Sequence, residues 1–223
     1  LRDSLMPIRS IFLSTPWHVI SILGASCGVM IRLVRGVIFE VGGTPTEPFV
    51  ITAAELVSLL FALTTVVLLT PSMPHIDLRR RRAQWLSIFR QMFGAMIVVI
   101  VAYFASTQIT VAYHLQPGAD SAVSPESELI INNSVLIFAA GGILITQWGK
   151  SLGVAATIVL WATCNAPLVF LTNFTPWPFA VLLDEGPWFS LEHVAATGLV
   201  LMANFLVQFR VAGAGAFAIR ADR

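Results

Sequence analysis

The stretch Pro71–Arg90, PSMPHIDLRRRRAQWLSIFR, decides how the rest of the chain is arranged. It lies between two long apolar runs and carries five arginines against a single acid, Asp77. Guanidinium groups stay protonated and are costly to move through hydrocarbon, so a loop of this kind remains on the cytoplasmic side of a membrane. With this loop fixed inside, the apolar runs on either side of it alternate across the bilayer.

The composition predicts a polytopic membrane protein. Of the 223 residues, 57% are hydrophobic and 11% are charged, whereas a soluble domain carries about 25% charged residues. The mean hydropathy is +0.82. We therefore expect membrane lipids, and no nucleic acid, among the molecules that the chain contacts.

Apolar runs of about 20 residues, the length that crosses a hydrocarbon core, recur along the chain. Six such runs are Trp17–Phe39, Val50–Thr70, Gln91–Thr110, Leu129–Trp148, Gly153–Leu171 and His193–Phe209. The segments placed inside carry Arg or Lys, and those placed outside carry acids without a base, as the positive-inside rule requires. The sequence predicts one all-α transmembrane domain over residues 1–223, with about six spans and both termini in the cytoplasm.

The first 15 residues are too polar to span a membrane. In Leu1–Thr15, apolar side chains recur at helical spacing at Leu1, Leu5, Ile8 and Phe12. This pattern favours an interfacial amphipathic helix. A short cytoplasmic leader that continues into the first span is the other interpretation.

Three charged residues fall within the predicted spans. Arg32 and Arg35 interrupt the first span, and Glu55 lies early in the second span at a similar depth. Charges at membrane depth are expensive and normally face protein or water. We expect an ion pair of Glu55 with Arg32 or Arg35, and the alternative is that Arg35 extends its side chain outward to the membrane surface.

Four polar or aromatic residues are candidates for a substrate pathway. Asn132 and Asn133 stand near the outer end of the fourth span, and Asn165 lies within the fifth. Amides in spans bond across helices or meet water. Trp177 belongs to the segment Thr172–Glu192, which is broken by prolines and rich in aromatics, so it either forms an external ligand platform or anchors the chain at the interface.

Motifs of catalysis and nucleotide binding are missing from the sequence. It contains no Gly-rich phosphate loop ending in Lys-Ser/Thr, no HExxH and no GxSxG. No two of the four histidines are spaced i, i+4 as metal ligands on a helix would be. We expect no catalytic residue, no metal site and no cofactor of its own in this chain, which is therefore not an enzyme by itself.

The arginine loop is the candidate surface for a partner. Arg79, Arg80, Arg81 and Arg82 would attract an acidic groove, and Trp85 would supply an apolar anchor, because Trp and Arg dominate the energetics of interfaces. The alternative is that these arginines only fix the topology.

The order of these parts resembles the membrane permease subunits of ABC exporters of the type-2 class. Those permeases have an amphipathic N-terminal helix, six spans with both ends inside, a cytoplasmic coupling helix between the second and third spans, and external re-entrant helices between the fifth and sixth. In this sequence the matching parts are Leu1–Thr15, the loop 71–90 and the segment 172–192. Arg32 and Arg35 within the first span depart from the family's usual pattern.

The stretch 173–201, NFTPWPFAVLLDEGPWFSLEHVAATGLVL, is also similar to permeases encoded beside ATPase genes in actinobacteria. Those permeases are associated with export of, or immunity to, antimicrobial compounds. The resemblance implies a bacterial plasma-membrane protein that moves an amphipathic compound or peptide. It also implies an ABC ATPase subunit that binds ATP and Mg, and a second permease copy or a related chain.

A second hypothesis of another class stays open. A membrane substrate-binding subunit of a vitamin-type importer also has about six spans and little catalytic chemistry. A neighbouring ATPase gene favours the exporter, whereas a small molecule retained through purification favours the binding subunit.

Overall fold

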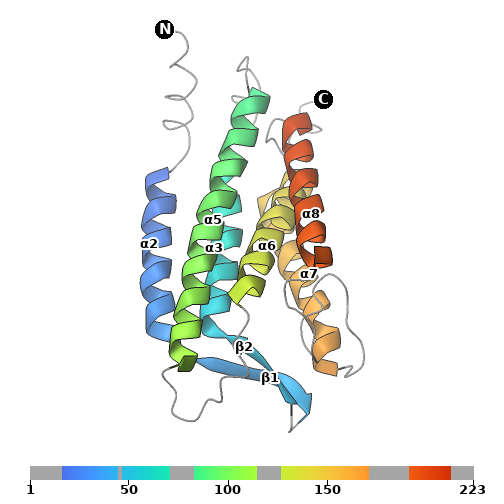
Figure 1. The fold of residues 1–223 in the computed structure, drawn as a ribbon. Coiled ribbons are helices and arrows are strands. Elements are labelled where there is room, and N and C mark those ends of the chain that lie inside the picture. Colours follow the sequence, from blue (N-terminus) through green and yellow to red (C-terminus); the bar gives the residue numbers. More distant parts are fainter. Residues whose placement is uncertain (1–16, 45–46, 71–82, 115–126, 171–190, 212–223) are drawn as a thin grey trace.

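A computed structural model describes residues 17–44, 47–70, 83–114, 127–170 and 191–211 (Figure 1). Over these residues the chain folds into six helices and one two-stranded hairpin. The elements are α2 (Trp17–Val34), β1 (Ile38–Thr44), β2 (Glu47–Thr52), α3 (Ala53–Leu69), α5 (Ala83–His114), α6 (Ser127–Trp148), α7 (Lys150–Phe170) and α8 (Leu191–Val211). The expected interfacial helix Leu1–Thr15, the loop 71–82 and the external segment 172–190 lie outside the described residues.

The six helices run side by side in alternating directions (Figure 1). Helix α2 begins, and α8 ends, at the same end of the bundle, which we call the Trp17 end. The hairpin lies at the opposite end, which we call the hairpin end. The two ends of the described chain therefore lie on the same side of the bundle.

Helix α6 is the centre of the bundle. It contacts α3, α5, α7 and α8, and its Phe138 and Ile145 are fully buried. By contrast, α2 buries only Ile20 and Ile31. The helices that α2 contacts extensively are α3 and α5. Side chains that α6 carries are therefore best placed to join several helices.

A glycine turn sets the close contact between α6 and α7. Gly149, between the two helices, has a φ of 81°, which disfavours other residues. Its N–H donates to Ile145 O at 2.9 Å, and Gly153 N donates to Gly149 O at the same distance. Gly153 then lies against the backbone of Ile145, where a Cβ would stand 2.6 Å from the Ile145 nitrogen.

The first predicted span is shorter than the sequence indicated. We expected Trp17–Phe39, but α2 ends at Val34, and Val37 N donates to Val34 O at 2.9 Å where the chain turns. Strand β1 follows from Ile38. Arg32 consequently lies in the last turn of α2 and Arg35 lies beyond it, so these charges stand at the helix end rather than in mid-span.

The segment after α2 forms an antiparallel hairpin where the sequence predicted an external turn. The pairing runs from Ile38 opposite Thr52 to Thr44 opposite Glu47. Ala53 N donates to Val37 O at 3.0 Å and ties the base of the hairpin to the start of α3. Strand β1 also contacts α7, so the hairpin reaches across the end of the bundle (Figure 1).

Helix α5 is longer than expected. The sequence predicted a cytoplasmic loop to Arg90 and a span over Gln91–Thr110, but the helix runs without a break from Ala83 to His114. Its 32 residues correspond to about 48 Å at 1.5 Å per residue. The last part of the arginine-rich segment is therefore the first part of a long helix.

Three helices are long and apolar enough to cross a membrane. Their candidate spans are Trp17–Val34, Ser87–Ile109 and Ile130–Trp148. The apolar stretches Ala53–Leu69, Lys150–Thr163 and Val194–Arg210 are shorter. Large apolar side chains such as Leu33 and Leu199, at 73% and 70% exposed, cover the outside of the bundle. These features indicate a membrane protein, since such surfaces are stable against lipid and not against water.

Candidate functional site

A pair of polar side chains joins α3 to α6 near the hairpin end. Thr52 caps α3, and its hydroxyl accepts the Glu55 N–H at 3.2 Å, which places Glu55 in the first turn. The Glu55 side chain is hydrogen-bonded to the side chain of Asn133 on α6. One turn further along α3, the hydroxyls of Ser58 and Ser134 lie 2.7 Å apart.

One hydrogen-bond acceptor of this polar pair, on Asn133, has no partner among the described residues. Asn133 is 8% exposed, and its Oδ1 has no hydrogen-bond partner among the described residues. A buried polar atom without a partner costs about 1–3 kcal/mol. This oxygen can therefore accept one more hydrogen bond.

An apolar groove lies directly beside the polar pair. It has a volume of about 150 Å³ and lies between α3, α6 and α7. Its lining residues are Leu56, Leu59, Leu60, Leu63, Ile137, Thr157, Ile158 and Trp161. Residues four apart share a helix face, so Leu59 follows Glu55 on α3 and Ile137 follows Asn133 on α6. The groove thus begins one helical turn from the pair.

The arrangement is amphipathic. The groove offers aliphatic surface and one aromatic ring. The polar pair offers the carboxyl of Glu55 and the Oδ1 of Asn133, which has no partner among the described residues. A ligand that combines an aliphatic part with a hydrogen-bond donor would be satisfied at both ends.

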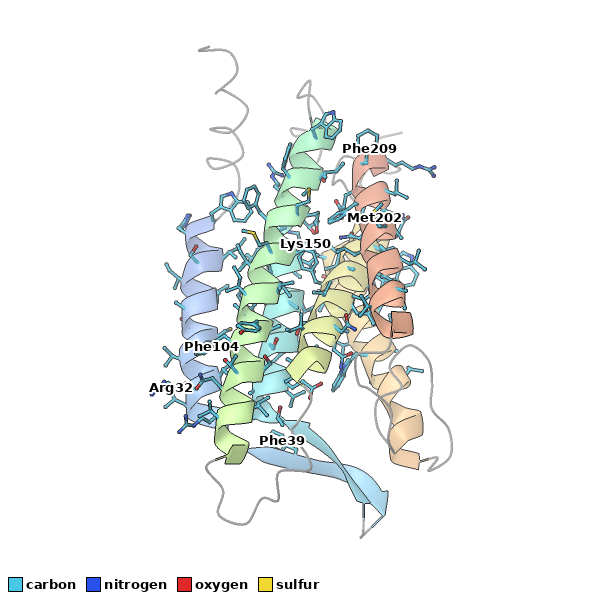
Figure 2. All side chains as sticks on the ribbon, viewed as in Figure 1. Arg32, Phe39, Phe104, Lys150, Met202 and Phe209 are labelled. Atoms are coloured by element: carbon cyan, nitrogen blue, oxygen red, sulfur yellow. The ribbon has the colours of Figure 1, made fainter. Side chains whose placement is uncertain are left out.

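The expected ion pair of Glu55 is not formed in the structure. Arg32 is exposed and extends away from the bundle on the outer side of α2 (Figure 2). Arg35 is half-buried beyond the end of α2. Among the described residues neither arginine pairs with Glu55, whose partner is instead Asn133. Helix α2 directs Arg32 away from the bundle, so the expected pair does not form.

The other candidate pathway residues have different outcomes. Asn132 is half-buried, next to Asn133. Asn165 lies in α7, in a part for which side chains are not described. Trp177 lies outside the described residues. Of the four, the structure therefore places only Asn133 in a contact between helices.

Of the candidate docking residues only Trp85 is described, and it lies at the Trp17 end. Arg79, Arg80, Arg81 and Arg82 fall outside the described residues, so their role stays a prediction. Trp85 is described and is 59% exposed. Its ring packs edge-on against Phe209 of α8, with ring centroids 5.9 Å apart. Figure 2 shows Phe209 near the end of α8 at that side of the bundle.

Several buried polar residues were not predicted as site residues. Ser87 and Gln91 on α5, and Asn204 and Gln208 on α8, are all at most 5% exposed. Each pair is spaced i, i+4 within an apolar helix, so the sequence already contained a pattern that could have identified them.

In the part of the chain that the structure describes, no group of three or more His, Cys, Asp or Glu side chains could hold a metal ion.

Comparison of the chain with protein-family models, with curated proteins and with solved structures found no match.

Proposed function

We propose that this chain is the transmembrane permease subunit of an ATP-driven exporter of the type-2 ABC class. It moves an amphipathic compound or peptide across the plasma membrane of a bacterium. ATP and Mg bind to a separate ATPase subunit, because the sequence contains no Gly-rich phosphate loop.

The observation that carries this proposal is the unbroken helix α5. It starts at Ala83, directly after the arginines, and continues to His114 at the hairpin end. A partner that pushes on the arginine segment would therefore move a rigid element of about 48 Å. The contact of Trp85 with Phe209 extends that movement to α8.

The proposed topology uses all six helices as spans. The helices alternate in direction (Figure 1). The Trp17 end holds Lys150 and the start of α5, which follows the arginines in the sequence, and these basic residues favour the cytoplasm. The hairpin end would then face outward. Helix α3, with 17 residues, is about 26 Å long, slightly short of the 30 Å core, and this difference is absorbed by local thinning of the bilayer.

The cargo class follows from the polar pair and the groove. An aliphatic part fits the groove of about 150 Å³ between α3, α6 and α7. A hydrogen-bond donor fits the acceptors of Glu55 and Asn133. The pathway is completed by a second copy of this chain or a related permease, which would cover part of the exposed apolar surface.

Affinity purification in mild detergent, with identification of the co-eluting chains, tests the proposal. We expect an ATPase subunit in stoichiometric amount. The double variant Trp85→Ala, Arg81→Ala should lose the ATPase or its cargo-stimulated hydrolysis while still inserting into the membrane. Trp148→Ala is the matched control, because Trp148 is also exposed but lies at the end of α6.

Two results would count against the proposal. An unchanged complex with unchanged stimulated hydrolysis in the double variant would refute docking through this segment. Purification with a tightly held small molecule and no ATPase would instead support the substrate-binding subunit of a vitamin-type importer.

A further inference from the structure

Three helices bring polar residues together between α5, α6 and α8. Helices α5 and α8 each contribute an i, i+4 pair, and α6 contributes the Gly142 carbonyl and the Thr146 hydroxyl. We call this group, with Thr197 of α8, the polar seam. Its members are Ser87, Gln91, Gly142, Thr146, Thr197, Asn204 and Gln208.

Gln208 is the centre of the layer nearest the Trp17 end. Its Nε2 donates to Thr146 Oγ1 at 2.7 Å and to Gly142 O at 3.3 Å. Its Oε1 accepts from Ser87 Oγ at 3.2 Å. Thr146 Oγ1 also donates to Gly142 O at 2.6 Å. This layer is well satisfied and connects all three helices.

The next layer is poorly satisfied. Asn204 is fully buried, and its Nδ2 donates to Gln91 Oε1 over a long 3.4 Å. Its Oδ1 has no partner among the described residues. The side chain lies where a Cβ of residue 142 would be, since that Cβ would stand 2.8 Å from Asn204 Cγ. Gly142 therefore makes the space in which this amide sits.

Thr197 leaves a second oxygen without a partner on the same face of α8. It stands seven residues, about two turns, before Asn204, so both side chains point to the same side. It is 4% exposed, and its Oγ1 has no hydrogen-bond partner among the described residues. The buried threonines Thr146 and Thr157 instead donate to the carbonyl four residues earlier.

The seam is an expensive way to hold helices together. Each buried oxygen without a partner costs about 1–3 kcal/mol, and hydrogen bonds between membrane helices return only about 0.6 kcal/mol on average. Apolar side chains of similar size would pack as well at lower cost. Polar groups in membrane spans face the bundle interior, where they pair across helices or line a water-filled pathway.

We propose that the polar seam is a cargo passage, closed in this structure, that receives neutral hydrogen-bond donors such as the hydroxyl and amide groups of the exported compound. This inference rests on the proposed function and names the chemistry that α8 recognises. It opens when α8 separates from α5 and α6, and the oxygens of Thr197 and Asn204 then gain partners.

The charges around the seam favour neutral donors over ammonium groups. Arg90, on α5 next to Gln91, is buried at 7% exposure. Lys150 and Arg210 lie at the Trp17 end of α7 and α8. On the described parts of α5, α6 and α8 whose side chains are placed, no acid faces the seam. A cation would be repelled by these charges, whereas hydroxyl and amide N–H groups would not.

Cysteine reactivity tests the passage without the ATPase. In a background with Cys27 and Cys164 replaced by Ala, Thr197→Cys is compared with Ala102→Cys, a fully buried position facing the apolar core. Each variant, in lipid nanodiscs, is treated with hydroxyethyl or ethyl methanethiosulfonate. The measured quantity is the rate with the hydroxyethyl reagent divided by the rate with the ethyl reagent.

We expect this ratio to be at least about tenfold higher at position 197 than at position 102, because polar probes enter only where the opened interface is polar. Adding Asn204→Leu, which makes the seam apolar at similar volume, should lower the ratio at position 197 to that of position 102. Thermal melting would show that this variant remains folded.

Equal ratios at the two positions would overturn the passage and leave the seam as a static contact. A high ratio that Asn204→Leu does not change would overturn it as well, because access would then not depend on the seam. If the protein recruits an ATPase but the reagent ratios at positions 197 and 102 are equal, the passage alone is rejected. If the ratio at position 197 is high but no ATPase is recruited, the proposed function alone is rejected.

Discussion

Asn204 of α8 and Gly142 of α6 occupy complementary space: the Asn204 amide lies where the side chain of any other residue at position 142 would begin. The fully buried amide thereby reaches the α6 backbone, whose Gly142 carbonyl already accepts from Thr146 and Gln208. A close contact of α6 with α8 is thus combined with hydrogen bonds between the two helices. An interface of this kind responds to very small changes in volume.

The first prediction concerns this glycine. Gly142→Ala should destabilise the protein by about 1–3 kcal/mol, because the added methyl group forces Asn204 away. Gly198→Ala is the control, since nothing lies within 4 Å of a Cβ there, and alanine is the better helix former. Melting temperatures in detergent measure both. Equal effects of the two substitutions would show that α6 and α8 are not packed as described.

The second prediction concerns the contact between α6 and α7. In Gly153→Ala the new methyl group meets the backbone of Ile145, which cannot rotate away as a side chain can. We expect a larger loss of stability than for Gly142→Ala, about 3 kcal/mol. Gly28→Ala, whose Cβ would stand 3.8 Å from Phe104, should change little. A Gly153→Ala variant as stable as Gly28→Ala would contradict the glycine turn geometry.

A double-mutant cycle checks the partner of Glu55. Glu55→Ala and Asn133→Ala should be coupled by about 0.6–2 kcal/mol, the usual range for hydrogen bonds between membrane helices. Glu55→Gln and Arg32→Gln should show no coupling, because Arg32 extends away from the bundle. Reversible unfolding in mixed micelles gives the four free energies. Coupling to Arg32 in place of Asn133 would restore the ion pair expected from the sequence.

The orientation in the membrane is tested at two exposed positions. Phe39 belongs to the hairpin and Ser151 to the first turn of α7, so they lie at opposite ends of the bundle. In cells carrying a cysteine-free background, an impermeant maleimide should label Phe39→Cys from outside. Ser151→Cys should react only after the membrane is made permeable. The reverse pattern would invert the proposed topology.

Much of the helical architecture could be predicted from the sequence. The apolar runs Val50–Thr70 and Leu129–Trp148 correspond closely to α3 and α6, because hydrophobic length is a strong signal for helices in membranes. The hairpin was missed. Its strands contain Gly42, Gly43 and Pro48, which indicate a turn, while the β-branched and aromatic residues at its base were counted as parts of the neighbouring spans.

Which residues meet at the site depends on which helices are neighbours in space, and this cannot be derived from a single sequence. The sequence predicted similar depths for Arg32 and Glu55, but depth does not say which way a side chain points around its helix. The seam needed α5, α6 and α8 to be neighbours, and nothing in Gln91 or Asn204 alone identifies the partner. The start of α5 was misplaced because hydropathy marks the edge of the hydrocarbon, whereas helix formers such as Ala83 and Leu86 extend a helix beyond it.

The final prediction tests α5 as a rigid connection. One alanine inserted between Leu86 and Ser87 would turn the preceding segment by about 100° relative to the spans. Trp85 would then lose its contact with Phe209, while the sequence from Arg79 to Trp85 stays unchanged. We expect the ATPase to bind still, and its hydrolysis to lose its response to cargo. An insertion of seven alanines, which restores the original face to within about 20°, should recover part of that response. If the single insertion leaves full coupling, α5 does not transmit the work, and another contact between the subunits must do so.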